Sequence, residues 1–373
     1  MKALGVKNRC RLFEIPSRIK YIIAQPHMRK YVDYAAEIYG TYLKYIEPKD
    51  IHVYSIDEVF IDATTYLPFY RLNAKQMAIM LMNAVYEKTK VRAAAGIGTN
   101  LYLAKIALDI TAKHSSDFIG ELDEDSYRKT LWDHRPLSDF WRIGHGIASR
   151  LAERGMFTMR DIANADENLL YRMFGIDAEL LIDHAWGKEP CTIADIKAYV
   201  PKGRSSISHG QVLMRDYSYD EAIIIVKEMA DVLCLQLAEA GMATDHISIG
   251  ISYARPSENP SSGMAMRLPQ ETSSDIDIIP AFVRLFKSCA IQGIKIRKLY
   301  LSCGNLSQDT GMVQPGLFDS KELILGREKH RKAQKAIIEI KKKYGKNSLL
   351  RGINLYKAST MRERNGQIGG HKA

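Results

Sequence analysis

The period of the hydrophobic pattern changes twice along the 373 residues of this chain, which limits what the chain can fold into. Apolar residues follow both strand and helix periods up to residue 122, only the helical period from 126 to 186, and both again from 206 to 306. A stretch that has the helical period alone cannot supply strands to a sheet. The sequence therefore predicts a multidomain α+β protein, with an all-α domain between two domains that contain sheets.

These changes of pattern set the predicted domain boundaries. We place a first sheet domain at residues 27–122, an all-α domain at 123–195, a polar linker at 196–205 and a second sheet domain at 206–306. In the second sheet domain the periods predict the order β-α-β-β-α-β, which is a small sheet with two helices on one face. Residues 1–26 contain only short apolar runs, and residues 307–373 contain a helix and a basic tail.

Positive charge is concentrated at the C-terminal end of the chain. The whole chain has a formal net charge of +10, whereas residues 321–373 carry 15 Lys and Arg against 4 Asp and Glu, a net charge of +11. The first 320 residues therefore have a net charge of −1. Such a block is typical of a segment that binds nucleic acid or another acidic surface, or of a solvated tail.

Cysteine usage and hydropathy point to the cytoplasm. The five cysteines include no Cys-x-x-Cys pair and their number is odd, so we expect free thiols instead of a disulfide framework or a zinc site. No apolar run reaches the roughly 18–20 residues of a membrane span, and the first residues lack the apolar region of a signal peptide. We therefore expect a cytoplasmic protein without a membrane partner.

An adjacent acidic pair interrupts two apolar runs in the first sheet domain. Asp57 and Glu58 lie within residues 54–60, Tyr-Ser-Ile-Asp-Glu-Val-Phe, between runs rich in β-branched and aromatic residues. The pattern predicts a strand, a tight reversal at the pair and a second strand. Neighbouring carboxylates repel each other, and a divalent cation that takes hard oxygen ligands, such as Mg²⁺, removes that repulsion. From the spacing alone, a solvated acidic turn remains the alternative.

Further stretches form an ordered series of motifs with the acidic pair. Residues 96–107 read Gly-Ile-Gly-Thr-Asn-Leu-Tyr-Leu-Ala-Lys-Ile-Ala, residues 143–146 read Ile-Gly-His-Gly, and residues 362–372 end the chain with Arg-Glu-Arg-Asn-Gly-Gln-Ile-Gly-Gly-His-Lys. With Tyr-Ser-Ile-Asp-Glu and the pattern of 206–305, they resemble the Y-family of translesion DNA polymerases. The resemblance is to the UmuC-like, or ImpB/MucB/SamB, proteins, and in particular to their Gram-positive bacterial branch.

The resemblance implies a palm at 27–122, a helix-hairpin-helix thumb at 123–195 and a little finger at 206–306. It also implies error-prone, DNA-directed DNA synthesis in DNA repair and the SOS response, by two-metal nucleotidyl transfer. By position, Asp57 would bridge two Mg²⁺ ions and Glu58 would ligate the ion at the primer terminus. Lys113 would contact the triphosphate of the incoming dNTP, and a solvated lysine at a helix end is the alternative for this residue.

Two groups of residues are candidates for binding primer–template DNA. Gly144 and Gly146, on either side of His145, would let backbone N–H groups approach a phosphate closely, and the N-terminus of the next helix adds a positive dipole. In the little finger, basic residues on strands or at strand ends suit a phosphate backbone: Arg255, Arg267 and Arg297. The alternatives are an ordinary turn between helices and solvated arginines.

A short motif follows the last predicted strand. Residues 314–318 read Gln-Pro-Gly-Leu-Phe, and Gln-x-x-Leu-Phe fits the pattern by which bacterial proteins bind the sliding clamp. Gln314 would make a polar contact, while Leu317 and Phe318 would fill an apolar pocket. Five residues are a weak match by themselves. The position just beyond the little finger is what favours the sliding clamp as a partner.

The resemblance lacks its beginning. In the family a first strand carries another catalytic aspartate, followed by an aromatic residue that excludes ribonucleotides, and no Asp-x-x-x-Phe-Tyr-Ala-Ser stretch precedes Asp57. We therefore expect an N-terminally truncated chain, in which residues 1–26 are a remnant of the fingers, the palm sheet is truncated and polymerisation is impaired. A separate chain that supplies the missing segment is a further expected partner. The alternatives are a non-catalytic remnant that binds DNA and the clamp, and a helix-hairpin-helix repair factor, against which residues 54–60 argue.

Overall fold

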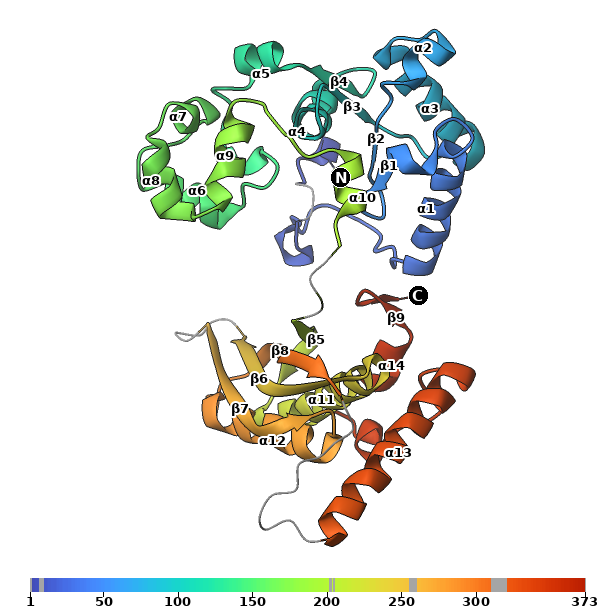
Figure 1. Cartoon of the computed structure of the whole chain (residues 1–373), viewed down its shortest axis with the longest axis vertical. Helices are drawn as coiled ribbons and strands as arrows, with labels where there is room; N and C mark the ends of the chain where they lie inside the picture. The colour runs from blue at the N-terminus through green and yellow to red at the C-terminus, as the bar shows by residue number, and fades with distance from the viewer. Residues whose placement is uncertain are drawn as a thin grey trace. The chain divides into compact units, whose positions relative to one another are not determined.

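The computed structural model describes residues 2–6, 10–200, 203, 205–254, 260–309 and 321–372, and the chain divides into two compact units (Figure 1). Arg29–Val200 form one unit, and Met1–Met28 with Pro201–Ala373 form the other. The division falls inside the predicted linker at 196–205. Within the described part of residues 1–26 the backbone makes two single 3-10 turns, at Lys2–Leu4 and Leu12–Glu14.

The first half of the unit 29–200 has helices around two small strand pairs. Its elements are α1 (Met28–Tyr42), β1 (Ile51–Val53), β2 (Val59–Ile61), α2 (Tyr66–Tyr70), α3 (Ala74–Thr89), β3 (Ala95–Gly98), α4 (Leu101–Ile106) and β4 (Ile119–Leu122). Strands β1 and β2 pair antiparallel, with Val53 opposite Val59. Strands β3 and β4 pair in parallel, as expected when a helix connects them.

Glycines set how closely α4 packs on the β3–β4 pair. A β-carbon at Gly96 would collide with the carbonyl oxygen of Ala104, and a β-carbon at Gly98 would collide with the amide nitrogen of the same residue. A β-carbon at Gly120 on β4 would likewise collide with the carbonyl oxygen of Ala107. Glycine permits this approach because it has no side chain. The small residues of β3 therefore allow α4 to lie directly on this strand.

The second half of this unit is helical. It contains α5 (Glu124–Thr130), α6 (His145–Ala152), α7 (Met159–Ala163), α8 (Glu167–Phe174), α9 (Asp177–Ala185) and α10 (Ile193–Ala198). One buried cluster joins α5–α9 to α4, and it includes Tyr102, Ile106, Tyr127, Phe140, Leu151, Leu170 and Leu181. These helices therefore pack onto α4 and share one hydrophobic core with it.

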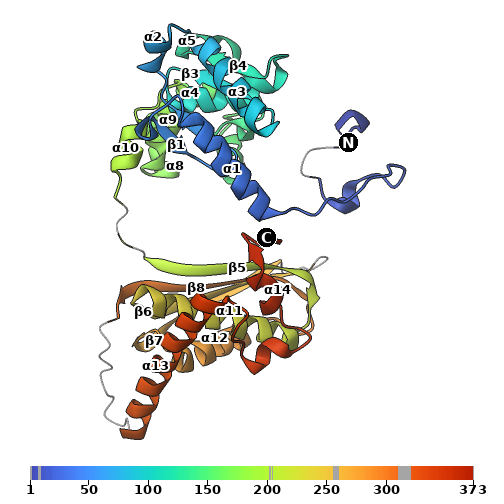
Figure 2. The ribbon, with the colours of Figure 1, turned by 90° about the vertical axis from the view of Figure 1, so that its right-hand side faces the viewer.

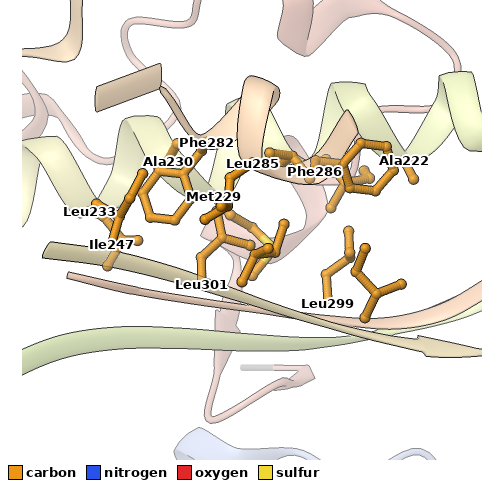
Figure 3. Packing of buried hydrophobic residues seen from close by; sticks show 14 of the residues in the cluster. Ala222, Met229, Ala230, Leu233, Ile247, Phe282, Leu285, Phe286, Leu299 and Leu301 are labelled. Atoms are coloured by element: carbon orange, nitrogen blue, oxygen red, sulfur yellow. The ribbon is translucent and has the colours of Figure 1, made fainter. Parts of the chain in front are cut away.

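The second unit contains a four-stranded antiparallel sheet. Its elements are β5 (Ser206–Tyr217), α11 (Tyr219–Ala240), β6 (Met242–Tyr253), β7 (Ser261–Thr272), α12 (Asp275–Cys289) and β8 (Ile296–Gln308), with the strand order β5-β8-β6-β7. Both helices cover the same face, and the core between them and the sheet includes Met229, Leu233, Phe282, Phe286, Leu299 and Leu301 (Figure 3). Of the described helices, none combines the length and apolar character that a bilayer-spanning segment needs.

The C-terminal basic segment is folded onto this unit. After α13 (Lys321–Tyr344), a 3-10 turn (Gly352–Leu355), α14 (Met361–Asn365) and a hairpin of β9 (Gln367–Ile368) and β10 (His371–Lys372) follow (Figure 2). Glu228 of α11, only 1% exposed, accepts hydrogen bonds from Asn354 Nδ2 at 2.9 Å and Thr360 N at 3.1 Å. A buried carboxylate needs such donors. These contacts anchor the segment, so it is a part of the domain and not a solvated tail.

The close approach of α4 to β3 gives a stability prediction. We expect Gly96→Ala to lower the free energy of unfolding by about 1–3 kcal/mol or more, because the added methyl group meets backbone atoms that cannot rotate away. Gly40→Ala in α1 is the matched control, since a β-carbon there meets nothing within 4 Å and the helix gains up to roughly 1 kcal/mol. Urea unfolding of both variants measures the difference. Equal midpoints would contradict the packing argument.

Candidate functional site

The acidic pair lies in a tight hairpin between β1 and β2. The amide nitrogens of Tyr54 and Ser55 both donate to the carbonyl oxygen of Glu58, at 3.0 and 3.1 Å. The backbone therefore reverses within residues 54–58, as the sequence predicted. This reversal matters because neighbouring residues on a regular strand point to opposite faces. A turn allows the side chains of Asp57 and Glu58 to leave from the same end of the strand pair.

The turn itself fixes the side chain of Asp57. Its Oδ1 atom accepts a hydrogen bond from Ser55 Oγ at 2.6 Å, and its amide nitrogen donates to the same hydroxyl oxygen at 3.3 Å. Serine and aspartate at this spacing commonly close such turns. Asp57 is exposed to solvent. One oxygen of the carboxylate is thus held by the turn, and the group as a whole faces outward.

A buried lysine holds Glu58. Lys105 Nζ lies 2.8 Å from both carboxylate oxygens of Glu58 and 3.2 Å from Asp109 Oδ2, and the Lys105 side chain is only 8% exposed. Burial lowers the pKa of Lys105, but its hydrogen bond to Glu58 and the charge of Asp109 outweigh burial, and the pKa is raised overall. The ammonium therefore stays charged and orients Glu58. Since Lys105 lies on α4, it joins the motif at residues 54–60 to the motif at residues 96–107.

Aromatic rings support the hairpin from the side. Trp141 Nε1 donates to the hydroxyl of Tyr54 at 2.9 Å, and the Tyr54 ring meets the rings of Phe60 and Trp141 edge-on at 5.6 and 5.8 Å between centroids. The Lys105 ammonium lies 5.5 Å from the centre of the Tyr54 ring. Edge-on rings and a cation near a ring face both contribute attraction. Through Trp141, the hairpin is tied to the helical block of the same unit.

Lys113 lies at the edge of this network. It follows α4 in a 3-10 turn (Ala112–His114), its side chain is 68% exposed, and its Nζ is 3.8 Å from Asp109 Oδ1. Asp109 therefore stands between Lys105 and Lys113. Lys113 is thus linked to Glu58 through Asp109 and Lys105, and the Lys113 ammonium is exposed to solvent.

The donor set of the hairpin fits a magnesium ion in type. Mg²⁺ is commonly bound by one or two carboxylates, with water and substrate phosphates completing its six positions. Asp57 and Glu58 supply two such carboxylates at the exposed end of the strand pair. Within the described part of the chain, no group of three or more His, Cys, Asp or Glu side chains is placed to hold a metal ion.

The predicted phosphate-binding turn opens α6. Gly144 is the N-cap of this helix without a side-chain cap, and the first helical bond is donated by Ala148 N to Gly144 O at 3.0 Å. Gly144, His145 and Gly146 are exposed, and a β-carbon at either glycine would meet nothing within 4 Å. The amide groups of the first turn are therefore open to a phosphate. A pocket of about 390 Å³ beside α6 is lined by Arg135 and His145 and by apolar residues that include Met156 and Phe157.

The sheet of the second unit has one open face, on the side away from α11 and α12. Strand register places Ser208, Ser302, Ser248 and Ala265 in one row across this face, and Gly210, Tyr300, Gly250 and Gly263 in the next. Small residues let another molecule come close to the backbone of the strands. These two rows carry no charged side chain, whereas the next row of the same face pairs Val212 with Lys298. Exposed Val212, Met214 and Tyr300 are the large side chains of this face.

The predicted basic residues of this unit lie at the margins of the open face. Arg267 is opposite His246 in the strand register, its side chain is 79% exposed, and its Nε donates to Asp245 Oδ2 at 2.7 Å. Arg297 is 45% exposed and lies 3.4 Å from Asp216 Oδ1. Each arginine is thus partly neutralised by its own domain. Arg255 and the clamp-motif residues Gln314, Leu317 and Phe318 lie outside the described residues.

The comparisons with known proteins agree with these motifs. The model of the impB/mucB/samB family matches residues 1–109, and the model of the C-terminal domain of that family matches residues 204–317. UvrX of Bacillus subtilis (strain 168), named for UV-damage repair, is 29% identical over 100% of this chain and 86% of its own length. A DNA polymerase IV 2 of Halalkalibacterium halodurans is 26% identical over 99% of this chain and 87% of its own length.

A solved structure agrees at the level of the fold. A Y-family DNA polymerase chimera matches 75% of this chain and 77% of its own length, with a TM-score of 0.53 and 19% sequence identity. The chain belongs to the impB/mucB/samB family, the UmuC-like branch of the Y-family DNA polymerases. The resemblance inferred from the motifs is thereby confirmed.

Lys105 is the residue of the site that sequence reasoning missed. It sits between Leu103 and Ile106, both fully buried, so a lysine at this position of an amphipathic helix requires a buried counter-charge. That requirement was the available signal. Nothing in the sequence, however, says that the partner is 47 residues away.

The Lys105 contacts predict a stability effect. We expect Lys105→Gln to lower the free energy of unfolding by about 1–3 kcal/mol, because it leaves the Glu58 and Asp109 carboxylates without their shared cation. Glu58→Gln added to Lys105→Gln should recover part of the loss, since the two side chains then carry no charge. Lys113→Gln is the control and should change stability by less than about 0.5 kcal/mol. Denaturant unfolding that ranks the two lysines equally would contradict the assignment.

Proposed function

We propose that this chain takes part in error-prone, template-directed DNA synthesis past damaged template positions. The observation that carries this proposal is the acidic hairpin: two carboxylates at a strand reversal, one of them oriented by a buried lysine from the next family motif. Family membership supports the same activity, because relatives carry names of DNA polymerase IV and of UV-damage repair. We accordingly propose primer–template DNA and dNTPs as its ligands, and a role in the SOS response.

In this proposal, Asp57 and Glu58 hold Mg²⁺ at the outer end of the hairpin. The metal, when bound, lowers the pKa of the primer 3′-hydroxyl and neutralises charge on the triphosphate. Ser55 and Lys105 leave each carboxylate enough lone pairs to ligate an ion, because an ionised carboxylate has about four acceptor positions. Lys105 then keeps Glu58 in one orientation, and Lys113 offers an exposed ammonium to the triphosphate.

The DNA-binding surfaces differ in what they supply. We propose that the amide groups at Gly144, His145 and Gly146 bind a phosphate of the duplex, without reading its sequence. We propose that the open face of the sheet in the second unit lies along the duplex backbone, where serines and glycines allow close approach. Arg255, Arg267 and Arg297 would add salt-dependent attraction to phosphates. Residues 314–318 would bind the sliding clamp.

We propose that the 373-residue chain polymerises poorly by itself. Only two carboxylates come together at the hairpin among the described residues, whereas two-metal phosphoryl transfer normally uses more protein ligands to fix both ions. A separate chain that adds a further carboxylate would complete the site. The second candidate function is that of a non-catalytic protein that binds DNA and the clamp, and the same shortage of carboxylates favours it.

The metal site can be tested apart from polymerisation. We expect Asp57→Asn with Glu58→Gln to abolish binding of Mn²⁺, measured by electron paramagnetic resonance, because neutral amides are much weaker ligands than carboxylates. Asp62→Asn is the matched control and should bind Mn²⁺ as well as the unchanged chain, since Asp62 only caps a turn through Thr64 N. Equal binding by all three chains would remove the proposed metal site.

Primer extension with the 373-residue chain then separates the two candidate functions. Slow extension that depends on Asp57 supports an impaired polymerase. No extension despite normal Mn²⁺ binding supports the non-catalytic protein, and extension at ordinary polymerase rates would contradict the proposed impairment.

The clamp motif has its own test. We expect Leu317→Ala with Phe318→Ala to weaken binding to a bacterial sliding clamp at least about tenfold, because two apolar side chains of a short peptide supply most of its binding energy. Met312→Ala with Val313→Ala removes apolar side chains just outside the pattern and is the matched control. Surface plasmon resonance on immobilised clamp measures both. Equal affinity of the two variants would exclude this motif as the clamp contact.

A further inference from the structure

Some basic residues of 321–373 contact their own unit and others do not. Three arginines turn toward their own unit: Arg331 lies 2.9 Å from Asp309, Arg351 lies 2.7 Å from Asp231 and also pairs with Asp275, and Arg364 donates to Gln211 at 2.8 Å. Arginine suits this task, because its planar group makes directed bonds and is weakly hydrated. These arginines attach the segment to the domain.

Several lysines of α13 point away from the unit. Gln334, 2% exposed, and Lys341, partly buried beside Asp231, mark the face of α13 that packs inward. Pointing away from this inward face lie four exposed lysines, which we call the lysine face: Lys329, Lys332, Lys335 and Lys343. Within residues 329–343, Glu339 is the one acidic residue. Lys342 pairs with Glu239 of α11 at 2.8 Å and is not part of the lysine face. The four lysines of the lysine face therefore outnumber the single acidic residue of this stretch.

The lysine face lies on the far side of the domain from the open face of the sheet. Helices α11 and α12 cover the inner face of the sheet, and α13 packs on both of them, so the helix layer separates the two surfaces (Figure 2). From Lys329 to Lys343 the lysine face is about 21 Å long. A duplex that lies along the open face therefore does not reach the lysine face unless it bends around the domain.

The chemistry of the lysine face fits a phosphate backbone better than a protein or a membrane. Between residues 329 and 343, its exposed apolar residues are Ala333 and Ala336. Protein interfaces need large apolar or aromatic anchors, and amphipathic membrane helices need bulky apolar side chains. A phosphate backbone needs neither, because release of counterions supplies most of the attraction.

We propose that the lysine face binds the phosphate backbone of a second stretch of nucleic acid, distinct from the duplex on the open face. This proposal rests on the proposed DNA-binding function and adds a second nucleic-acid surface to it. The two surfaces differ in kind. The open face positions a duplex by close backbone approach, whereas the lysine face attracts any nucleic acid through charge, without reading sequence.

The test counts duplexes on the full chain. A 12-base-pair DNA duplex is titrated at low salt and its stoichiometry is measured by sedimentation velocity. We expect two duplexes per chain. In the triple variant Lys329→Gln, Lys332→Gln, Lys335→Gln the second duplex should bind at least about tenfold more weakly, and the slope of log K against log salt for that step should fall by about 3, one for each lysine.

Matched variants separate this proposal from the proposed function. Lys30→Gln, Lys44→Gln and Lys129→Gln remove the same charge from exposed lysines of the other unit and should leave the second duplex bound. Arg267→Gln should weaken only the first duplex. A single bound duplex, or a triple variant that keeps both duplexes with the same slope, would overturn the lysine-face proposal. A chain that binds no duplex would overturn both proposals.

Discussion

The contact between Lys105 and Glu58 is the interaction on which the candidate site depends. The Lys105 ammonium, on a side chain that is 8% exposed, lies against both carboxylate oxygens of Glu58. Without it, the Glu58 carboxylate would repel that of its neighbour Asp57. This contact forms only because α4 lies directly on β3, and that position requires glycine at 96 and 98. Strand β3, helix α4 and the acidic hairpin therefore depend on one another structurally, although they are separate motifs in the sequence.

Local features of the site could be predicted from the sequence, and long-range partners could not. The reversal at Asp57 and Glu58 follows from two β-rich runs with an acidic pair between them, and the structure has it. Lys105 was missed because its partner is 47 residues away. Arg267 was predicted as a DNA contact, but its place on the open face depends on a bulge between Thr244 and His246, which shifts the register of β6 against β7.

The C-terminal segment shows the same limit. Its charge predicted a nucleic-acid contact or a solvated tail, and composition cannot distinguish a folded segment from a solvated one. The outcome depends on Glu228, whose hydrogen-bond partner Asn354 is 126 residues further along the chain. A carboxylate inside the apolar stripe of α11 has the same meaning as a lysine inside that of α4. In both helices, a charged residue at a core position indicated that another segment must come to meet it.

The distribution of charge also assigns different tasks to different surfaces. The first 320 residues have a net charge of −1, and Arg267 and Arg297 are paired with carboxylates of their own domain. In the proposed function, these pairs weaken the long-range attraction of Arg267 and Arg297 for DNA, so close fit would supply more of the affinity of the open face. The surplus of +11 in residues 321–373 acts over about a Debye length, roughly 8–10 Å at physiological salt. The two proposals thus assign capture of nucleic acid by charge and positioning of a duplex by shape to different surfaces of one domain.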